Sequence, residues 1–227
     1  MLKHLHKTIA MVIFFVMFAI TTVSAQNLVY IEQVGNTNTV TITQVGNNNR
    51  VGNAGSPSTI TGNSNTLTTT QTGNSNIIDY SVTGNSNTVT KTVTGDTNQI
   101  TFTCGDGTTA CTGVTSTMTL TGNLNTVTST IKGDSITNTL AITGNSNTVT
   151  QTITTDDSTS NVTILGDSNT LTSSMTGASA GGGHHLVAAV TGTSNTHTIT
   201  QYGTVDTTVN LTTTGNSNTV VINTGRN

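Results

Sequence analysis

The sequence predicts an all-β fold, a two-sheet β-solenoid of 22-residue coils in which each coil holds two strands and two arcs. Three observations lead to this prediction. The segment Thr-Gly-Asn-Ser-Asn at residues 61–65 returns at Thr72, Thr83, Thr143 and Thr214. Its glycine recurs every eleven residues, and strictly alternating segments separate the copies. Because self-similarity at a fixed period indicates stacked repeats, we expect about seventeen strands in eight to nine coils.

Residues 1–25 are expected to be a secretory signal peptide that does not belong to the solenoid. Lys3 and Lys7 precede an apolar run, and small residues at Ser24 and Ala25 provide the spacing of a cleavage site. The run is shorter than the roughly 18 residues of a membrane span. The repeat domain is therefore expected to cover residues 26–227, without a membrane span.

The segments between the arcs are predicted to be strands. In residues 65–71 and 147–153, threonine alternates with Val, Leu, Ile, Gln or a further Thr, and alternation of this kind is typical of β-structure. Counted from the Asn that opens each strand, even positions are expected to face inward and the Thr-rich odd positions to face water. From Val114 onward alternate strands lack the full Gly-x-x-Asn signature, so the complete coil has 22 residues.

The inward Asn and Gln side chains are predicted to form amide ladders along the axis. Identical residues meet in successive coils of an amyloid-like stack, where side-chain amides can satisfy one another. Only 3% of the residues are aromatic and 7% are charged, so the core must come from this stacking. The expected ladder positions are Asn27, Gln33, Asn38, Gln44, Asn49, Asn65, Gln71, Asn76, Asn87, Asn98, Asn125, Asn147, Asn169, Asn195, Gln201 and Asn218.

The arcs are predicted to be tight turns, because glycine tolerates positive φ and asparagine nearly does. Insertions near residues 49–61, 104–111 and 177–183 are expected to lengthen three connections between strands. The expected arc glycines are Gly35, Gly46, Gly62, Gly73, Gly84, Gly95, Gly122, Gly144, Gly166, Gly192 and Gly215.

The two cysteines bracket one of these insertions. Cys104 occupies the last inward position of a strand, and Cys111 stands where an arc glycine is expected. In a secreted chain this arrangement favours a local disulfide, with two free thiols as the alternative. The spacing does not match a redox or zinc-binding CxxC motif.

Three inward positions do not suit a dry core. Lys91 and Gln151 lie at strand centres, and His197 replaces an aliphatic residue. We expect Lys91 to lie over Tyr80 or Phe102 in a cation–π contact.

No catalytic, cofactor or metal site is predicted, and the chain is not expected to be an enzyme. After the signal peptide there are four basic and nine acidic residues, a net charge of 4 − 9 = −5, which does not suit nucleic acid. His184 and His185 are adjacent on a strand and so point to opposite faces, which favours a structural role over metal binding. The arc acids are expected to be solvated turn carboxylates, with a weak calcium site as the alternative: Asp96, Asp134, Asp156, Asp157 and Asp167.

Residues 27–49 carry the pattern Asn-x-aliphatic-x-aliphatic-x-Gln-x-Gly-x-x-Asn twice, with Gln33-x-Gly35-x-x-Asn38 at the end of the first copy. This pattern resembles the curlin repeat of bacterial curli subunits, secreted proteins that assemble into extracellular amyloid fibres of biofilms. The resemblance implies a matrix protein of a Gram-negative bacterium that supports adhesion and cell aggregation. The implied partners are further copies of itself, a nucleator subunit and an outer-membrane secretion channel.

Physical reasoning about the ends of the solenoid supports the same function. The repeats begin at Asn27, where curlins carry a non-repetitive leader, and continue to the last strand. Terminal coils of this kind expose unpaired strand edges, and head-to-tail contacts that do not close produce filaments. Two alternatives stay open: an ice-binding solenoid that uses its Thr rows, and the stalk of a cell-surface adhesin.

Overall fold

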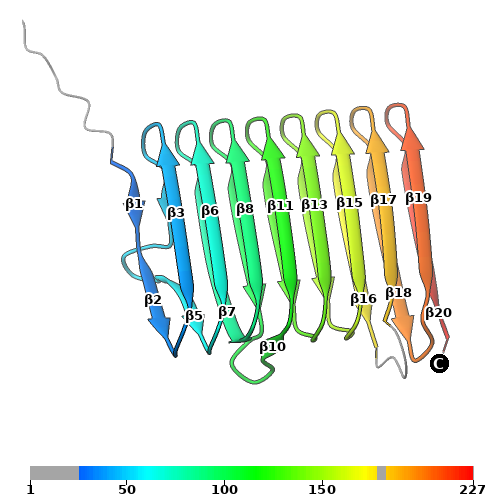
Figure 1. Cartoon of the computed structure of the whole chain (residues 1–227). Coiled ribbons are helices and arrows are strands. Elements are labelled where there is room, and N and C mark those ends of the chain that lie inside the picture. Colours follow the sequence, from blue (N-terminus) through cyan, green and yellow to red (C-terminus); the bar gives the residue numbers. More distant parts are fainter. Residues whose placement is uncertain (1–25, 178–182, 227) are drawn as a thin grey trace, which may run out of the picture.

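The computed structural model describes residues 26–177 and 183–226, so the predicted signal peptide lies outside the described residues. These residues form two parallel sheets that wind into a β-solenoid, as predicted (Figure 1). Most coils advance by 22 residues, and insertions lengthen some of them to 27. The described part of the chain contains no helix, and hence none that could cross a membrane.

Every coil contributes to both sheets. The twelve-stranded sheet contains β1 (Leu28–Val29), β2 (Ile31–Val34), β4 (Arg50–Val51), β5 (Ser58–Thr61), β7 (Ile77–Asn85), β9 (Gln99–Cys104), β10 (Cys111–Thr112), β12 (Thr126–Ile131), β14 (Thr148–Ile153), β16 (Thr170–Thr176), β18 (Thr196–Gly203) and β20 (Thr219–Arg226). The eight-stranded sheet contains β3 (Thr39–Val45), β6 (Thr66–Thr72), β8 (Thr88–Thr94), β11 (Thr115–Thr121), β13 (Thr137–Thr143), β15 (Thr159–Leu165), β17 (His185–Thr191) and β19 (Thr208–Thr214).

The strands stack in register, so each position of the repeat forms a column along the axis. Leu67 of β6 pairs with Val89 of β8, and both side chains are buried. Along each strand, the threonines that alternate with these inward residues, such as Thr66, lie on the outer face. Aliphatic residues from both sheets meet in one continuous core, which is how a chain with few aromatic residues excludes water.

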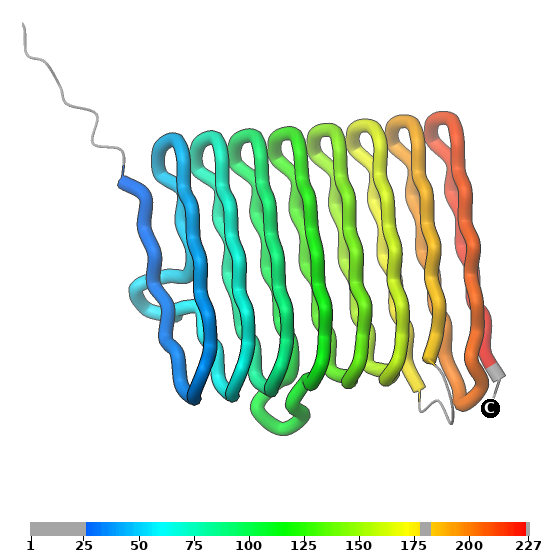
Figure 2. Tube along the Cα trace, viewed as in Figure 1, coloured from blue at the N-terminus to red at the C-terminus, as the bar shows by residue number. Residues whose placement is uncertain are grey.

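The two edges of the solenoid differ (Figure 2). Arcs that lead from the eight-stranded to the twelve-stranded sheet have the same four-residue form throughout, and we call this side the regular edge. The opposite side, the variable edge, carries the Cys104–Cys111 loop, and it is also the edge at which β16 ends and β17 begins. The regular edge lies at the top of Figure 1 and the variable edge at the bottom.

One insertion lies elsewhere than predicted. The arc before Arg50 has the regular form, and residues 52–57 interrupt the following strand between β4 and β5 instead of lengthening the connection. Val51 and Ser58 on either side are buried, and Asn53 pairs with Ser56 to close the bulge. The inserted residues can leave the sheet in mid-strand because the column resumes at Ser58, whose hydroxyl accepts the backbone N–H of Tyr80 at 2.9 Å.

Candidate functional site

A continuous column of nine asparagines, the long Asn ladder, runs along the twelve-stranded sheet at the regular edge. Each asparagine donates its backbone N–H to the Oδ1 of its predecessor, and from Asn76 onward its Nδ2 donates there as well, at 2.9–3.1 Å. The ladder comprises Asn27, Asn49, Asn76, Asn98, Asn125, Asn147, Asn169, Asn195 and Asn218.

From Asn27 to Asn195, the Nδ2 of each ladder asparagine also donates forward to the carbonyl of an arc glycine. Asn147 donates to the carbonyl of Gly166 at 2.8 Å, while its Oδ1 accepts two bonds from Asn169. Asn147 is fully buried, so water cannot replace these bonds. One side chain therefore joins three consecutive coils.

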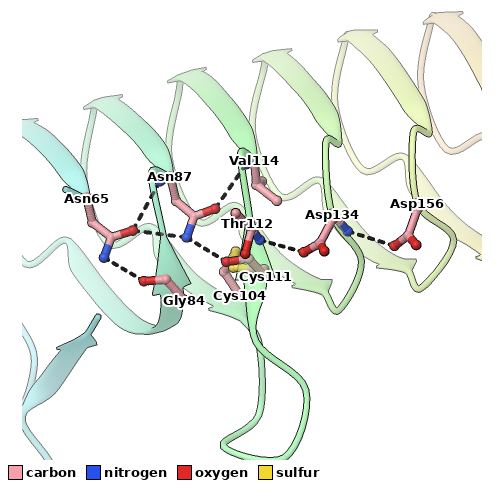
Figure 3. The surroundings of a disulfide bond; sticks show 9 residues. All are labelled: Asn65, Gly84, Asn87, Cys104, Cys111, Thr112, Val114, Asp134 and Asp156. Atoms are coloured by element: carbon pink, nitrogen blue, oxygen red, sulfur yellow. Dashed lines mark hydrogen bonds between the residues drawn. A yellow bond between two sulfur atoms is a disulfide. The ribbon is translucent and has the colours of Figure 1, made fainter. Parts of the chain in front are cut away.

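A second column, the short Asn ladder, begins on the eight-stranded sheet and stops early. Asn38, Asn65 and Asn87 are bonded in the same way. The Oδ1 of Asn87 then accepts the backbone N–H of Val114 (Figure 3). Later coils place Ile136, Ser158, His184 and Thr207 in this column, which is the loss of signature noted in the sequence.

The glutamines Gln44, Gln71 and Gln201 form hydrogen bonds, but they do not form a continuous ladder as the asparagines do. Gln44 donates to the Oε1 of Gln71 at 2.7 Å, and Gln71 donates to two backbone carbonyls. Gln201 bonds to the carbonyls of His185 and Thr207. Gln33 lies in register with the buried Ile60 but is exposed in the first coil, because no described strand covers it.

An outer ladder at the arcs was not predicted from the sequence. The residue after the arc glycine is usually Asn or Asp, and its Oδ1 accepts the backbone N–H of the equivalent residue in the preceding coil at 2.6–3.0 Å. The recurrence of Asn or Asp directly after the glycine was the available signal. The acceptors are Asn63, Asn74, Asn85, Asp96, Asn123, Asp134, Asn145, Asp156, Asp167 and Asn216.

This outer ladder gives four of the five arc aspartates a bonded role. Asp156, for example, accepts the backbone N–H of Asp134 at 2.8 Å. Asp157 differs, because it has a positive φ of 54° and donates its N–H to the carbonyl of Asp134. Within the described residues, no cluster of three or more His, Cys, Asp or Glu side chains is placed to hold a metal ion.

The predicted arc glycines all have positive φ, between 106° and 143°. The second positive φ of the arc belongs to the residue two positions later, usually Ser, and not to Asn as expected. The asparagines of the arc lie on either side of this residue, in the outer ladder and in the inner ladder.

Lys91 is buried in the core and lies over an aromatic ring, as expected. Its Nζ is 4.2 Å from the centroid of Phe102 and donates to the Ser116 hydroxyl at 2.8 Å. Burial lowers the pKa of Lys91 to about 7. Tyr80 bonds to Thr69 beside it, and burial raises the pKa of Tyr80.

We expect Lys91 to make folding more favourable as pH rises between about 7 and 10.5. The folded state releases the lysine proton near pH 7, whereas the unfolded chain keeps it to near the ordinary lysine pKa of 10.5. The free energy of unfolding should therefore increase by roughly 2 kcal/mol between pH 7.5 and 9. Denaturant titrations at these two pH values measure the slope, and the variant Lys91→Met should remove it. An equal slope in the variant would assign the effect to another group.

Gln151, His197 and His184 each have at least one hydrogen-bond partner in the core. Gln151 donates to the Ser160 hydroxyl at 3.0 Å, and His197 pairs with Thr213 at 2.9 Å, with its pKa lowered by burial. His184 is buried and accepts the backbone N–H of Thr207 at Nδ1. His185 is exposed on the opposite face of the strand.

Cys104 and Cys111 form a disulfide that closes the inserted loop (Figure 3). Cys111 pairs with Gly84, and its carbonyl accepts the Nδ2 of Asn87, so it occupies the place of an arc glycine. The loop is also anchored by Lys132, which contacts Asp106 at 2.8 Å.

Removing this disulfide should lower stability moderately. Both sulfurs are buried, and the bond closes a short loop of sequence separation 7, for which about 2–3 kcal/mol is expected. Thermal unfolding with and without a strong reductant measures the loss. A Cys104→Ala, Cys111→Ala double variant should have the melting temperature of the reduced protein, and reductant should not change it. If reductant left the melting temperature of the parent unchanged, the loop would be held by its other contacts alone.

Ladder groups are unpaired at both ends of the described solenoid. Among the described residues, no hydrogen bond reaches the Oδ1 of Asn218 or the backbone N–H of Asn216 in the last arc, or the Oδ1 of Asn36 in the first. The outermost strands, β1 to β3 at one end and β19 and β20 at the other, have a strand neighbour on one side only. The two ends thus offer complementary donors and acceptors in the same geometry that joins the coils.

A comparison with known protein families supports the predicted resemblance. The family model of the curlin associated repeat matches residues 25–52, which include β1, β2, β3 and β4. No curated protein and no solved structure was found to be similar. The matched segment opens both Asn ladders, and both the repeat and the solenoid fit a curli-like structural subunit. The chain is therefore a two-sheet β-solenoid that carries the curlin associated repeat, which confirms its resemblance to the curlin family.

Proposed function

We propose that this chain is a secreted structural subunit that stacks head to tail into curli-like amyloid fibres of a biofilm matrix, where the fibres serve adhesion and cell aggregation. The observation that carries the proposal is the long Asn ladder, which reaches both end coils and leaves its terminal groups unpaired. Unpaired strand edges are templates for a further strand. The partner with the best-matched edge is another copy of this chain.

The composition of the end coils favours such growth. Glu32 is the one charged residue of β1, β2 and β3, and Arg226, the last residue of β20, is the one charged residue of β19 and β20, whereas edge charges are the usual protection against strand addition. A contact between unlike ends does not close, so it produces a filament. By analogy with curlins, a nucleator subunit and an outer-membrane secretion channel are further proposed partners.

Fibre diffraction and electron microscopy of the secreted protein test this function. We expect unbranched filaments with reflections near 4.8 Å and 10 Å, the spacings of strands and of packed sheets. The variant Ile222→Lys places a charge on the inward face of β20 and should lengthen the lag time severalfold. Its matched control, Val221→Lys, alters the neighbouring outward residue, which is 63% exposed, and should assemble like the parent. A parent protein that stayed monomeric for days would overturn the proposal.

Ice binding is a second candidate, favoured by the threonine columns on the outer faces. Thr66, Thr88, Thr115 and Thr137 lie in register on four successive strands, and equivalent columns cover the other sheet. Their spacing is about 4.8 Å along the axis and roughly 6.7 Å along the strand. A thermal-hysteresis measurement tests this candidate, and no hysteresis would remove it. The adhesin-stalk alternative requires attachment to the cell, which cell fractionation tests.

A further inference from the structure

We propose that the second copy of the chain joins the end formed by β19 and β20 after a half-turn about the solenoid axis, so that the two sheets exchange places at every junction. This inference rests on the proposed head-to-tail assembly and specifies its interface. It follows from the sheet topology, from the register of the end strands and from the polar groups that they leave unpaired.

The described residues contain an odd number of arms. An arm is the strand, or the interrupted strand, that crosses a sheet once in each coil. Nine arms lie in the twelve-stranded sheet and eight in the other, so the first arm (β1 and β2) and the last (β20) belong to the same sheet. Arms of the two sheets alternate along the axis. The next vacant place after β20 is therefore on β19, in the eight-stranded sheet.

Stacking without rotation would leave that place empty. Arms β1 and β2 of the second copy would lie on β20, and β3 would face β19 across a missing strand, at about twice the usual 4.8 Å separation. A gap of this size would leave backbone groups on both sides unpaired, at a substantial free-energy cost. A half-turn removes the gap, because β1 and β2 then pair with β19, and β3 pairs with β20.

The half-turn also matches the inward side chains. Counted from the residue that opens each arm, the second and fourth positions of β20 and β3 carry the same residue types. Of the eight residues that would form the inward pairs, Val209 is already buried at 5% exposure, whereas the other seven are partly or largely exposed, Val29 at 48%. The resulting inward pairs are Val220 with Val40, Ile222 with Ile42, Val209 with Val29, and Leu211 with Ile31, the second residue of each pair in the second copy.

The polar groups at the ends find partners in the same arrangement. The arc that contains Asn218 meets the arc that contains Asn38 of the second copy, so the free Oδ1 of Asn218 accepts from Asn38 as each ladder residue does within the chain. Thr224 has a buried hydroxyl without a partner. It meets Gln44 of the second copy, whose Nε2 already donates to Gln71, which leaves the Gln44 Oε1 to accept the hydroxyl proton.

Paired cysteines distinguish the two stacking modes. Thr212 of β19, Asn223 of β20 and Glu32 of β2 are exposed and occupy the same position of the repeat. With the half-turn, Thr212 lies beside Glu32 of the second copy, and without it Asn223 does. Neighbouring strands bring such residues within disulfide range. The test pair is Thr212→Cys with Glu32→Cys, and the matched control is Asn223→Cys with Glu32→Cys.

Fibres of each variant are oxidised and analysed on a non-reducing gel after denaturation. We expect the test pair to yield a ladder of covalent oligomers and the control pair to yield monomer. The reverse result would overturn the half-turn but retain head-to-tail stacking. Fibres that cross-link in neither variant would overturn the interface described here. Failure of the parent protein to form fibres would overturn the proposed function itself.

Discussion

Replacing Gly144 with alanine is expected to destabilise the solenoid by at least about 4 kcal/mol, which is exceptional for a single substitution. The glycine has a φ of 138°, and an added Cβ would lie 2.0 Å from the carbonyl oxygen of Gly166 in the next arc. The obstacle is backbone and cannot rotate away. Separating the two arcs would also break the bond from Asn147 to Gly166. Denaturant unfolding of freshly prepared monomer measures the loss.

Two other glycines serve as graded controls for this prediction. Gly55 has no positive φ and no atom within 4 Å of an added Cβ, so Gly55→Ala should change stability by less than about 0.5 kcal/mol. Gly107 has a φ of 85° and the same open surroundings, so Gly107→Ala should cost about 1 kcal/mol of backbone strain alone. If Gly144→Ala cost no more than Gly107→Ala, the close approach of the arcs would not be the reason for the glycine.

The substitution Asn147→Ala is expected to cost about 3–5 kcal/mol, because it leaves several buried groups without partners. Asn169 would lose the acceptor of its backbone N–H and of its Nδ2, and the carbonyl of Gly166 would lose a donor. Since a buried site admits no replacement water, each group bears its own desolvation penalty. The free energy of unfolding of the monomer measures the effect.

The matched control for Asn147 is Asn145 in the same arc. Asn145 belongs to the outer ladder, where its Oδ1 accepts the backbone N–H of Asn123 at 2.9 Å in an exposed position. Because water can take over this bond, Asn145→Ala should cost less than about 1 kcal/mol. Equal losses at the two positions would mean that burial adds nothing to the ladder.

Periodicity made much of this molecule predictable. In-register stacking of equal repeats places like residues above one another, so the alternation in residues 147–153 suffices to assign inward and outward faces. The same frame located Cys111 in the column of arc glycines, opposite Gly84. It also brought Lys91 over Phe102, although these residues lie in different sheets.

Departures from the period were harder to predict. The insertion at residues 52–57 contains Gly and Pro, which are typical of a connection, yet it interrupts a strand. Composition indicates that extra residues leave the sheet but does not indicate where. That choice depends on which flanking residues, here Val51 and Ser58, fill the core columns of the adjacent coil.

The sequence alone determined the coil, the two sheets and the identity of the residues that face inward. These properties follow from a sequence repeat that recurs in each coil and stacks in register. Only the tertiary structure decided how the polar atoms are joined. Whether the side chain of an asparagine bonds to the preceding coil or to the following coil, and whether to a side chain or to the backbone, depends on atoms supplied by those coils. Asn145 accepts a backbone N–H of the preceding coil, whereas Asn147 donates its Nδ2 to the side chain of Asn125. The local sequence of one repeat contains no information on those distances, since they exist only once the coils are stacked.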